Sequence, residues 1–278
     1  MNTDDQLQTE EQQMIDLKRK LRATWEAGDY GYFAQYLELG ALEFLDRQRI
    51  APGSKLLDVA CGAGQITIPA AKNGIEVTGL DLAQNLVDQA RKRALEEGVF
   101  IQIDQGDAED LPYEAESFDA VLSLIGAMFA PRPHLVASEM IRVCRPGGKI
   151  IMGNWTATSF VGQMFKIIGK RVPPPSNFPS PLLWGDQDIV AQRFGNGVKE
   201  STITTHLYPL KYPFPPAEVV KFFNTYYGPT VKACGSLNQE EKQELERELT
   251  ALWEEHNLVT DGTTEVQSEY IEFVGTRA

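Results

Sequence analysis

The sequence predicts an α/β protein with a mostly parallel sheet. Three observations carry this prediction: strand and helix patterns alternate from residue 55 to residue 153, a glycine-rich turn follows the first strand, and Gly74 and Gly98 end the next two helices. Parallel neighbours need a crossover connection, and a right-handed helical crossover packs back onto the sheet. The alternation therefore indicates one sheet with helices on both faces.

The individual elements follow from local patterns. Two helices are expected first, between about Met14 and Arg49, joined by a turn at Gly28 and Asp29. The alternating region is expected to contain strand 55–60, helix 65–73, strand 75–80, helix 85–97, strands 100–104 and 118–124, helix 134–144 and strand 149–153. Beyond it we expect a strand over 200–207, helices over 216–227 and 239–255, and a final strand over 268–276.

The composition changes after the fifth strand. Of the 26 aromatic residues, 13 lie between Trp155 and Tyr227, and the prolines at 173–175, 179 and 181 exclude a single regular element there. We therefore divide the chain into an N-terminal helical cover, an α/β core, an aromatic-rich insertion that is expected to fold back as a lid, and a C-terminal helix and strand that complete the core. The corresponding ranges are 1–50, 51–154, 155–237 and 238–278.

Charge and cysteine content exclude several classes of partner. With 26 Lys and Arg against 39 Asp and Glu, the net charge is −13, which repels nucleic acid and anionic lipid and leaves a small molecule as the expected partner. The three cysteines are scattered and odd in number, which favours a reducing compartment, and no metal-ligand spacing is present. The sequence shows no apolar run of transmembrane length, so we expect a cytoplasmic protein.

The turn after the first strand carries the strongest functional signal. It reads Leu57-Asp58-Val59-Ala60-Cys61-Gly62-Ala63-Gly64-Gln65, and Asp81 ends the next strand. Glycines between a strand and a helix let a ligand approach free backbone N–H groups. An acid at the end of the second strand is placed to accept both hydroxyls of a ribose. Together these features predict a nucleoside site.

Two residues distinguish between nucleosides. The dinucleotide fingerprint requires a third glycine where this chain has Thr67. Asp58, just before the turn, would repel a pyrophosphate but attract an α-amino group. This pattern favours a nucleoside with a cationic amino-acid tail over a nicotinamide dinucleotide.

Five segments resemble the motifs of class I S-adenosylmethionine (SAM)-dependent methyltransferases. They are Asp58-Val59-Ala60-Cys61-Gly62-Ala63-Gly64, Gly79-Leu80-Asp81, Gly106-Asp107-Ala108-Glu109-Asp110-Leu111-Pro112, Phe118-Asp119-Ala120-Val121 and Arg142-Val143-Cys144-Arg145-Pro146-Gly147-Gly148. The likeness is greatest to the branch of ubiquinone- and menaquinone-biosynthesis C-methyltransferases (methyltransferase type 11). It implies a Rossmann-like sheet of seven strands, mostly parallel with the last antiparallel, a helical N-terminal cover and a lid insertion after strand five.

The resemblance also implies SAM as cofactor, with S-adenosylhomocysteine as product, and a set of residues that hold it. The methionine moiety is assigned to Asp58, Gly62, Gly64 and Ser123, the ribose to Asp81, and the adenine to Leu82, Asp107 and Ala108. Tyr30, in a segment that such enzymes fold over the cofactor, and Ala60 in the first motif complete the expected set.

The acceptor is expected beyond the carboxyl ends of strands four and five. The candidate wall residues are Phe33, Met128, Phe129, Asn154, Trp155, Phe160, Met164 and Trp184. The stretch after strand four lacks the Asn-Pro-Pro-Tyr type signature of amino-methylating enzymes of nucleic acids, which weighs against adenine or glutamine amide substrates. The aromatic wall candidates favour a small, fairly apolar acceptor. In-line displacement at a sulfonium methyl depends mainly on positioning, and no catalytic base is assigned; His206 is the one histidine worth testing.

Three alternatives remain at this point. The first is a nicotinamide-dependent oxidoreductase, which Thr67 and Asp58 disfavour. The second is a SAM-binding enzyme of non-methylating chemistry, and the third is a non-catalytic protein on the same scaffold. The sequence leaves the acceptor, its reacting atom and the oligomeric state open.

Overall fold

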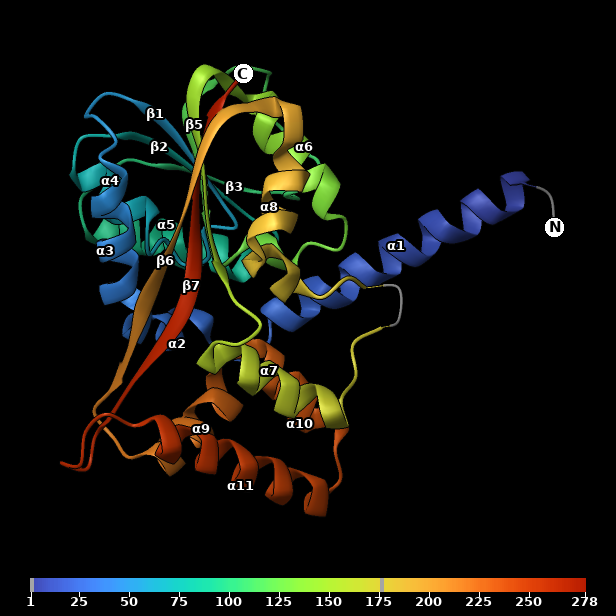
Figure 1. The fold of residues 1–278 in the computed structure, drawn as a ribbon, viewed down its shortest axis with the longest axis vertical. Coiled ribbons are helices and arrows are strands. Elements are labelled where there is room, and N and C mark those ends of the chain that lie inside the picture. Colours follow the sequence, from blue (N-terminus) through green and yellow to red (C-terminus); the bar gives the residue numbers. More distant parts are fainter. Residues whose placement is uncertain (1–2, 176–177) are drawn as a thin grey trace.

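The computed structural model describes residues 3–175 and 178–278, and its centre is one seven-stranded mixed sheet (Figure 1). The strands are β1 (Lys55–Val59), β2 (Glu76–Asp81), β3 (Gln102–Gln105), β4 (Phe118–Leu124), β5 (Cys144–Trp155), β6 (Val198–Tyr212) and β7 (Thr264–Arg277). They lie in the order β3-β2-β1-β4-β5-β7-β6. Strands β1 to β5 pair in parallel, whereas β7 runs antiparallel to both β5 and β6. The predicted fold class is confirmed, including the antiparallel last strand.

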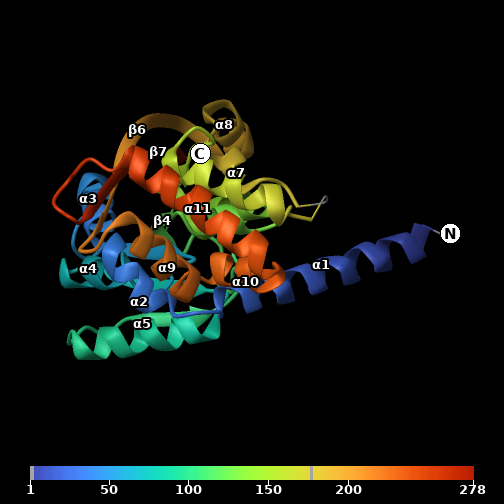
Figure 2. The same cartoon turned by 90° about the horizontal axis from the view of Figure 1, so that it is seen from below.

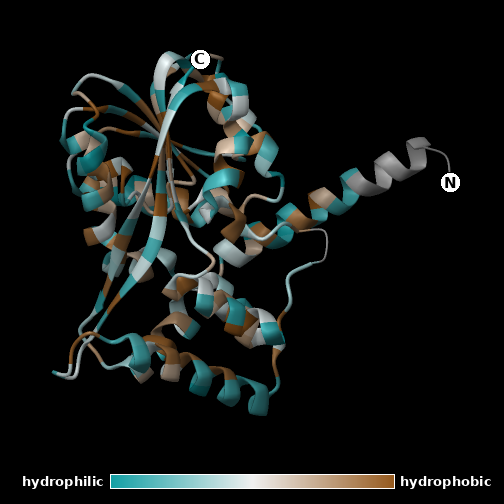
Figure 3. Cartoon of the chain, viewed as in Figure 1, coloured by the Kyte–Doolittle hydropathy of each residue, from teal (hydrophilic) through white to brown (hydrophobic). Residues whose placement is uncertain are grey.

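Helices cover both faces of this sheet. In Figure 1, α3 (Glu38–Gln48), α4 (Thr67–Lys72) and α5 (Gln84–Glu96) lie on one side, and α6 (Pro133–Val143) and α8 (Gln187–Phe194) lie on the other. Leu86, Val87, Ala90 and Ala94 form the buried stripe of α5, as their spacing predicts. Figure 3 shows that hydrophobic residues gather where the strands converge.

A helical layer lies beyond the carboxyl ends of the parallel strands. It contains α7 (Phe160–Arg171), α9 (Pro216–Tyr226), α10 (Gly228–Ser236) and α11 (Gln239–His256), and the outer side of α11 is hydrophilic (Figures 1 and 3). The long strands β6 and β7 pair from Val198 and Arg277 to Tyr212 and Thr264, and they connect the sheet to this layer. The range 155–237 thus holds three helices of the layer together with α8 and edge strand β6, and the division into regions stays a prediction.

The N-terminal segment packs beside the same end of the sheet. It contains α1 (Thr3–Trp25), α2 (Tyr30–Ala34) and α3, and α1 begins earlier than the expected Met14 because residues 3–13 contain no glycine or proline. Figure 2 shows that α1 approaches the body of the protein only with its C-terminal part. No helix within residues 3–175 and 178–278 is long and apolar enough to cross a membrane.

Candidate functional site

The site forms where the chain direction across the sheet reverses. Strands β1 and β4 are neighbours, yet β1 continues to β2 on one side and β4 to β5 on the other. Ala60 and Ile125, which follow these two strands, both have left-handed backbone angles, with φ of 59° and 56°. Gly126 passes so close that a Cβ there would lie 2.6 Å from the Cβ of Ala60. This closely packed crossing of two turns is the usual ligand position in an open α/β sheet, and strained backbone there is typical of functional sites.

The glycine-rich turn after β1 depends on its two glycines. Gly62 and Gly64 have φ of +55° and +87°, a region in which a side chain would be strained. The ring of Tyr30 on α2 lies over Gly62, 3.3 Å from where a Cβ would stand. Tyr30 thus covers this turn on the side of α2, and both Tyr30 and Gly62 line the cavity described below.

Asp81 at the end of β2 braces the turn. Its two carboxylate oxygens accept backbone N–H groups from Gly62 and Ala83, each at 2.9 Å. Burial raises the pKa of Asp81 to about 6, although the bonds from Ala83 and Gly62 lower it. Each oxygen uses one of its two lone pairs in this way and keeps the other for a further donor.

Asp58 is the second buried acid of the site. Its carboxylate is 2% exposed and accepts a 2.6 Å hydrogen bond from the hydroxyl of Thr67 at the start of α4. Burial raises the pKa of Asp58 to about 7; the Thr67 hydrogen bond lowers it, and the charge of Asp81 raises it. The residue that breaks the dinucleotide fingerprint is thus a hydrogen-bond donor to this acid.

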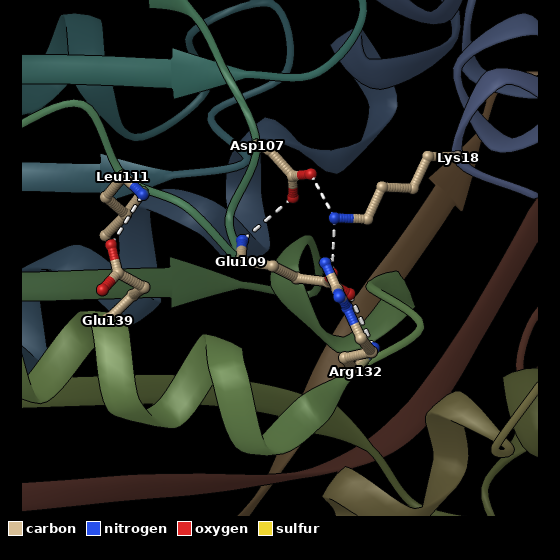
Figure 4. Close-up of polar contacts among 6 residues, drawn as sticks. All are labelled: Lys18, Asp107, Glu109, Leu111, Arg132 and Glu139. Atoms are coloured by element: carbon tan, nitrogen blue, oxygen red, sulfur yellow. Dashed lines mark hydrogen bonds and ion pairs between the residues drawn. The ribbon is translucent and has the colours of Figure 1, made fainter. Parts of the chain in front are cut away.

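The loop after β3 carries the third predicted acid. The Oδ1 of Asp107 accepts the backbone N–H of Glu109 at 2.9 Å, and its Oδ2 lies 2.5 Å from the Nζ of Lys18 on α1 (Figure 4). The far end of the loop is fixed by Glu139 on α6, which accepts the N–H of Leu111 at 2.7 Å. Sequence reasoning missed Lys18 and Glu109.

A cavity of about 1430 Å³, including its open mouth, brings most of the predicted residues together. From the cofactor set, it is lined by Tyr30, Asp58, Ala60, Gly62, Asp81, Leu82, Asp107 and Ala108. From the acceptor set, it is lined by Phe33, Phe129, Trp155 and Met164. The two predicted sets thus share one space.

Other predicted residues lie off this wall. Gly64 packs against Ile68, and the buried Ser123 hydroxyl donates to the carbonyl of Val59 and accepts the N–H of Ala127. The remaining acceptor candidates are buried and do not line the cavity; they are Met128, Asn154, Phe160 and Trp184. His206 lies in β6 with its ring 3.8 Å from the carboxylate of Glu272, away from the cavity wall.

Three further aromatic residues, Trp25, Tyr208 and Tyr227, belong to the wall. Trp25 on α1 meets Phe129 with ring centroids 5.0 Å apart, and Tyr227 stacks on Phe33 at 4.9 Å. Tyr208 of β6 packs edge-on against Trp155 at 5.3 Å. The aromatic enrichment after residue 155 was the signal for Tyr208 and Tyr227, but no local pattern shows which of these rings face the cavity.

Comparison with known proteins agrees with this geometry. A family model described as a methyltransferase domain matches residues 57–152. An uncharacterized protein of Mycobacterium tuberculosis strain H37Rv is 36% identical over 250 residues, which is 88% of this chain and 90% of that protein. A demethylmenaquinone methyltransferase of Renibacterium salmoninarum is 33% identical over 163 residues, 53% of this chain and 67% of that enzyme. The chain belongs to the class I, SAM-dependent methyltransferase family.

The methyltransferase fold extends well beyond the matched domain. Phosphoethanolamine N-methyltransferase 2 of Haemonchus contortus, solved with SAM, superposes with a TM-score of 0.54 at 16% identity. The superposition covers 85% of this chain and 52% of that one, and at this identity it supports the fold alone.

The cavity of this methyltransferase has two chemically different ends. The charged side chains on its wall are Lys18, Asp58, Asp81 and Asp107, which come from α1, β1, β2 and the loop after β3. The wall supplied by α2, β5, α7, β6 and α9 is aromatic and aliphatic. In the described part of the chain, no group of three or more His, Cys, Asp or Glu side chains is arranged to hold a metal ion.

Proposed function

We propose that the protein transfers a methyl group from SAM to a small, fairly apolar acceptor. The observation that carries this proposal is that one cavity takes its three acids from the end of the sheet formed by β1, β2 and β3, and aromatic rings from the end formed by β5 and β6. A nucleoside with a cationic tail suits the first end, and an uncharged acceptor suits the second. The name of the demethylmenaquinone methyltransferase relative supports an apolar acceptor as well.

The residues of the acidic end fit the parts of SAM. The free lone pairs of Asp81 suit the two ribose hydroxyls, and Asp107 with Leu82 and Ala108 suits the adenine. Asp58 offers a negative charge to the α-amino group, directly or through water. Gln65 lines the cavity, and its amide nitrogen is buried without a protein partner in the described chain, so it suits the carboxylate of the methionine moiety.

When bound, SAM would supply an electrophilic sulfonium methyl group for in-line displacement by a nucleophilic acceptor, with S-adenosylhomocysteine as the leaving group. The chain's contribution is to position the acceptor and exclude water, and positioning is worth at most about 7–11 kcal/mol. The described wall residues include no histidine, and burial raises the pKa values of Tyr30 and Tyr227, so these hydroxyls stay protonated. We therefore expect an acceptor whose attacking atom needs no strong base from the protein.

Transfer of an isotope-labelled methyl group from SAM tests this function directly. Purified protein is incubated with labelled SAM and a metabolite library that includes quinone-like and phenolic acceptors, and labelled product is measured. Asp81→Asn is the site control, because it places an amide against two backbone N–H donors and weakens SAM binding. Turnover of SAM without label in any product would indicate the non-methylating alternative. A melting temperature raised by NAD(H) and not by SAM would overturn the proposal.

A further inference from the structure

We propose that Lys18 of α1 belongs to the cofactor site and clamps this helix over the adenine end through Asp107 and Glu109. The helix presents one face to the cavity, since Lys18, Leu21 and Trp25 are spaced three and four residues apart and all line it. That the ligand is SAM rests on the proposed function. The clamp itself is a contact within the chain.

Glu109 is the centre of the clamp. Its side chain is 0% exposed, and its Oε2 lies 2.5 Å from the Nζ of Lys18 and 2.7 Å from the Nε of Arg132. Its Oε1 accepts the backbone N–H of Arg132 at 2.6 Å. A carboxylate this buried requires charged partners, and here they come from two distant segments (Figure 4).

The two cations connect the walls of the cavity. Lys18 belongs to α1, and Arg132 follows Pro131, which lines the cavity beyond β4. Glu109 lies in the loop that carries Asp107 and Ala108, the proposed adenine contacts. One buried carboxylate therefore joins the N-terminal cover, the adenine loop and the turn beyond β4.

Lys18 also determines how Asp107 is held. The Oδ1 of Asp107 is fixed by the N–H of Glu109 and its Oδ2 by Lys18, so the carboxylate has one orientation. Each oxygen keeps a lone pair for the amino group of an adenine. The charges of Lys18 and Arg132 offset the repulsion between the carboxylates of Asp107 and Glu109. Lys18 thus acts as a positioning residue for the nucleoside.

Among the described residues, the other anchors of α1 lie on the C-terminal side of Lys18, where Trp25 packs on Phe129. The end of α1 packs on α10, where a Cβ on Gly228 would lie 2.0 Å from the carbonyl oxygen of Thr24. Just beyond it, the carboxylate of Glu26 accepts the N–H of Gln84 at 3.3 Å. Toward its N-terminus α1 leaves the body of the protein (Figure 2). Loss of the Lys18 clamp should therefore loosen the helix from Lys18 toward its N-terminus first.

Lys18→Met tests the clamp, with Lys20→Met as the matched control. The first variant removes a cavity-lining ammonium and keeps an apolar stem, whereas Lys20 lies exposed on the same helix. Amide hydrogen exchange over residues 12–25 and SAM affinity are measured for both. We expect Lys18→Met to raise hydrogen exchange and to weaken SAM binding about tenfold, which is a typical effect for a partly buried charge pair. Lys20→Met should resemble the wild type in both measurements. Raising the salt concentration should weaken binding more in the wild type than in Lys18→Met.

Glu109→Gln and the double variant show whether the clamp acts through Glu109. If it does, the loss of SAM affinity in Lys18→Met/Glu109→Gln is smaller than the product of the two single losses. If amide hydrogen exchange and SAM affinity in Lys18→Met equal those of the wild type, the proposed clamp is overturned. Wild-type protein that binds no SAM would overturn the proposed function instead, and the effect on hydrogen exchange would still decide the clamp.

Discussion

The hydroxyl of Thr67 donates a 2.6 Å hydrogen bond to the buried carboxylate of Asp58. The donor starts α4 and the acceptor is in β1, so the bond spans the glycine-rich turn that both residues flank. This bond favours the charged form of an acid whose burial raises its pKa to about 7. The pair thus sets the pH at which the turn presents a negative charge to a ligand.

Thr67→Val should raise the pKa of Asp58 further. Valine keeps the methyl group that packs near Gly79 and removes the hydroxyl. Because a cationic amino group prefers ionised Asp58, SAM affinity should fall at neutral pH and recover at higher pH. Titration calorimetry across pH 6–9 measures this, and Thr67→Ser, which keeps the hydroxyl, should behave as wild type. Identical pH profiles for the valine and serine variants would contradict the assignment.

The stability of the free protein should fall as pH rises through the Asp58 titration. The pKa of Asp58 is raised from 3.8 to about 7, so the folded state binds more protons than the unfolded state between these values. The stabilisation is fully present below pH 3.8 and is lost as pH rises toward 7; the difference is at most about 4 kcal/mol. Urea unfolding at several pH values measures it. In Asp58→Asn the contribution of Asp58 to the slope of unfolding free energy against pH should be absent. An unchanged slope would contradict the raised pKa of Asp58.

Gly126→Ala should disrupt the crossing of the two turns. Its Cβ would lie 2.6 Å from both the Cβ and the carbonyl oxygen of Ala60, and overpacking of this kind costs about 1–3 kcal/mol. Gly169→Ala is the control, because nothing lies within 4 Å of its Cβ inside α7, and a helical alanine gains up to about 1 kcal/mol over glycine. Chemical unfolding of both variants should give opposite signs. A neutral Gly126→Ala would show that the turns can separate freely.

His206→Gln should leave methyl transfer unchanged. The ring lies in β6, near Glu272 and Thr204, and away from the cavity wall. Comparison of kcat/KM and its pH profile with the wild type measures the effect. A large loss of kcat with normal folding and normal SAM affinity would assign a catalytic role to His206.

Local patterns predicted the sheet and most of the charged residues that line the cavity. They did not show in which direction the individual aromatic and polar side chains point. Asn154 and Trp155 were both expected on the acceptor wall, but consecutive residues of β5 point to opposite faces, and Trp155 is the one that lines the cavity. Phe160 instead packs on Trp253 at 4.4 Å, and Trp184 lies under the guanidinium of Arg193 at 4.2 Å. Large aromatic residues occur in hydrophobic cores as well as in ligand sites, so the residue type alone does not show which of the two a ring belongs to.

The sequence by itself determined the alternation of strands and helices, the glycine-rich turn and the positions of the three acids near the ends of their strands. These features depend on residues close together in the sequence. Parallel strands all end at the same edge of the sheet, so an acid or a glycine-rich turn directly after a strand lies at that edge, whatever the position of the strand in the chain. Only the tertiary structure decided which aromatic rings line the cavity and that Lys18 reaches Asp107, 89 residues away. Such contacts depend on how α1 and the helical layer dock, and docking follows from the packing of whole surfaces, which no local spacing encodes.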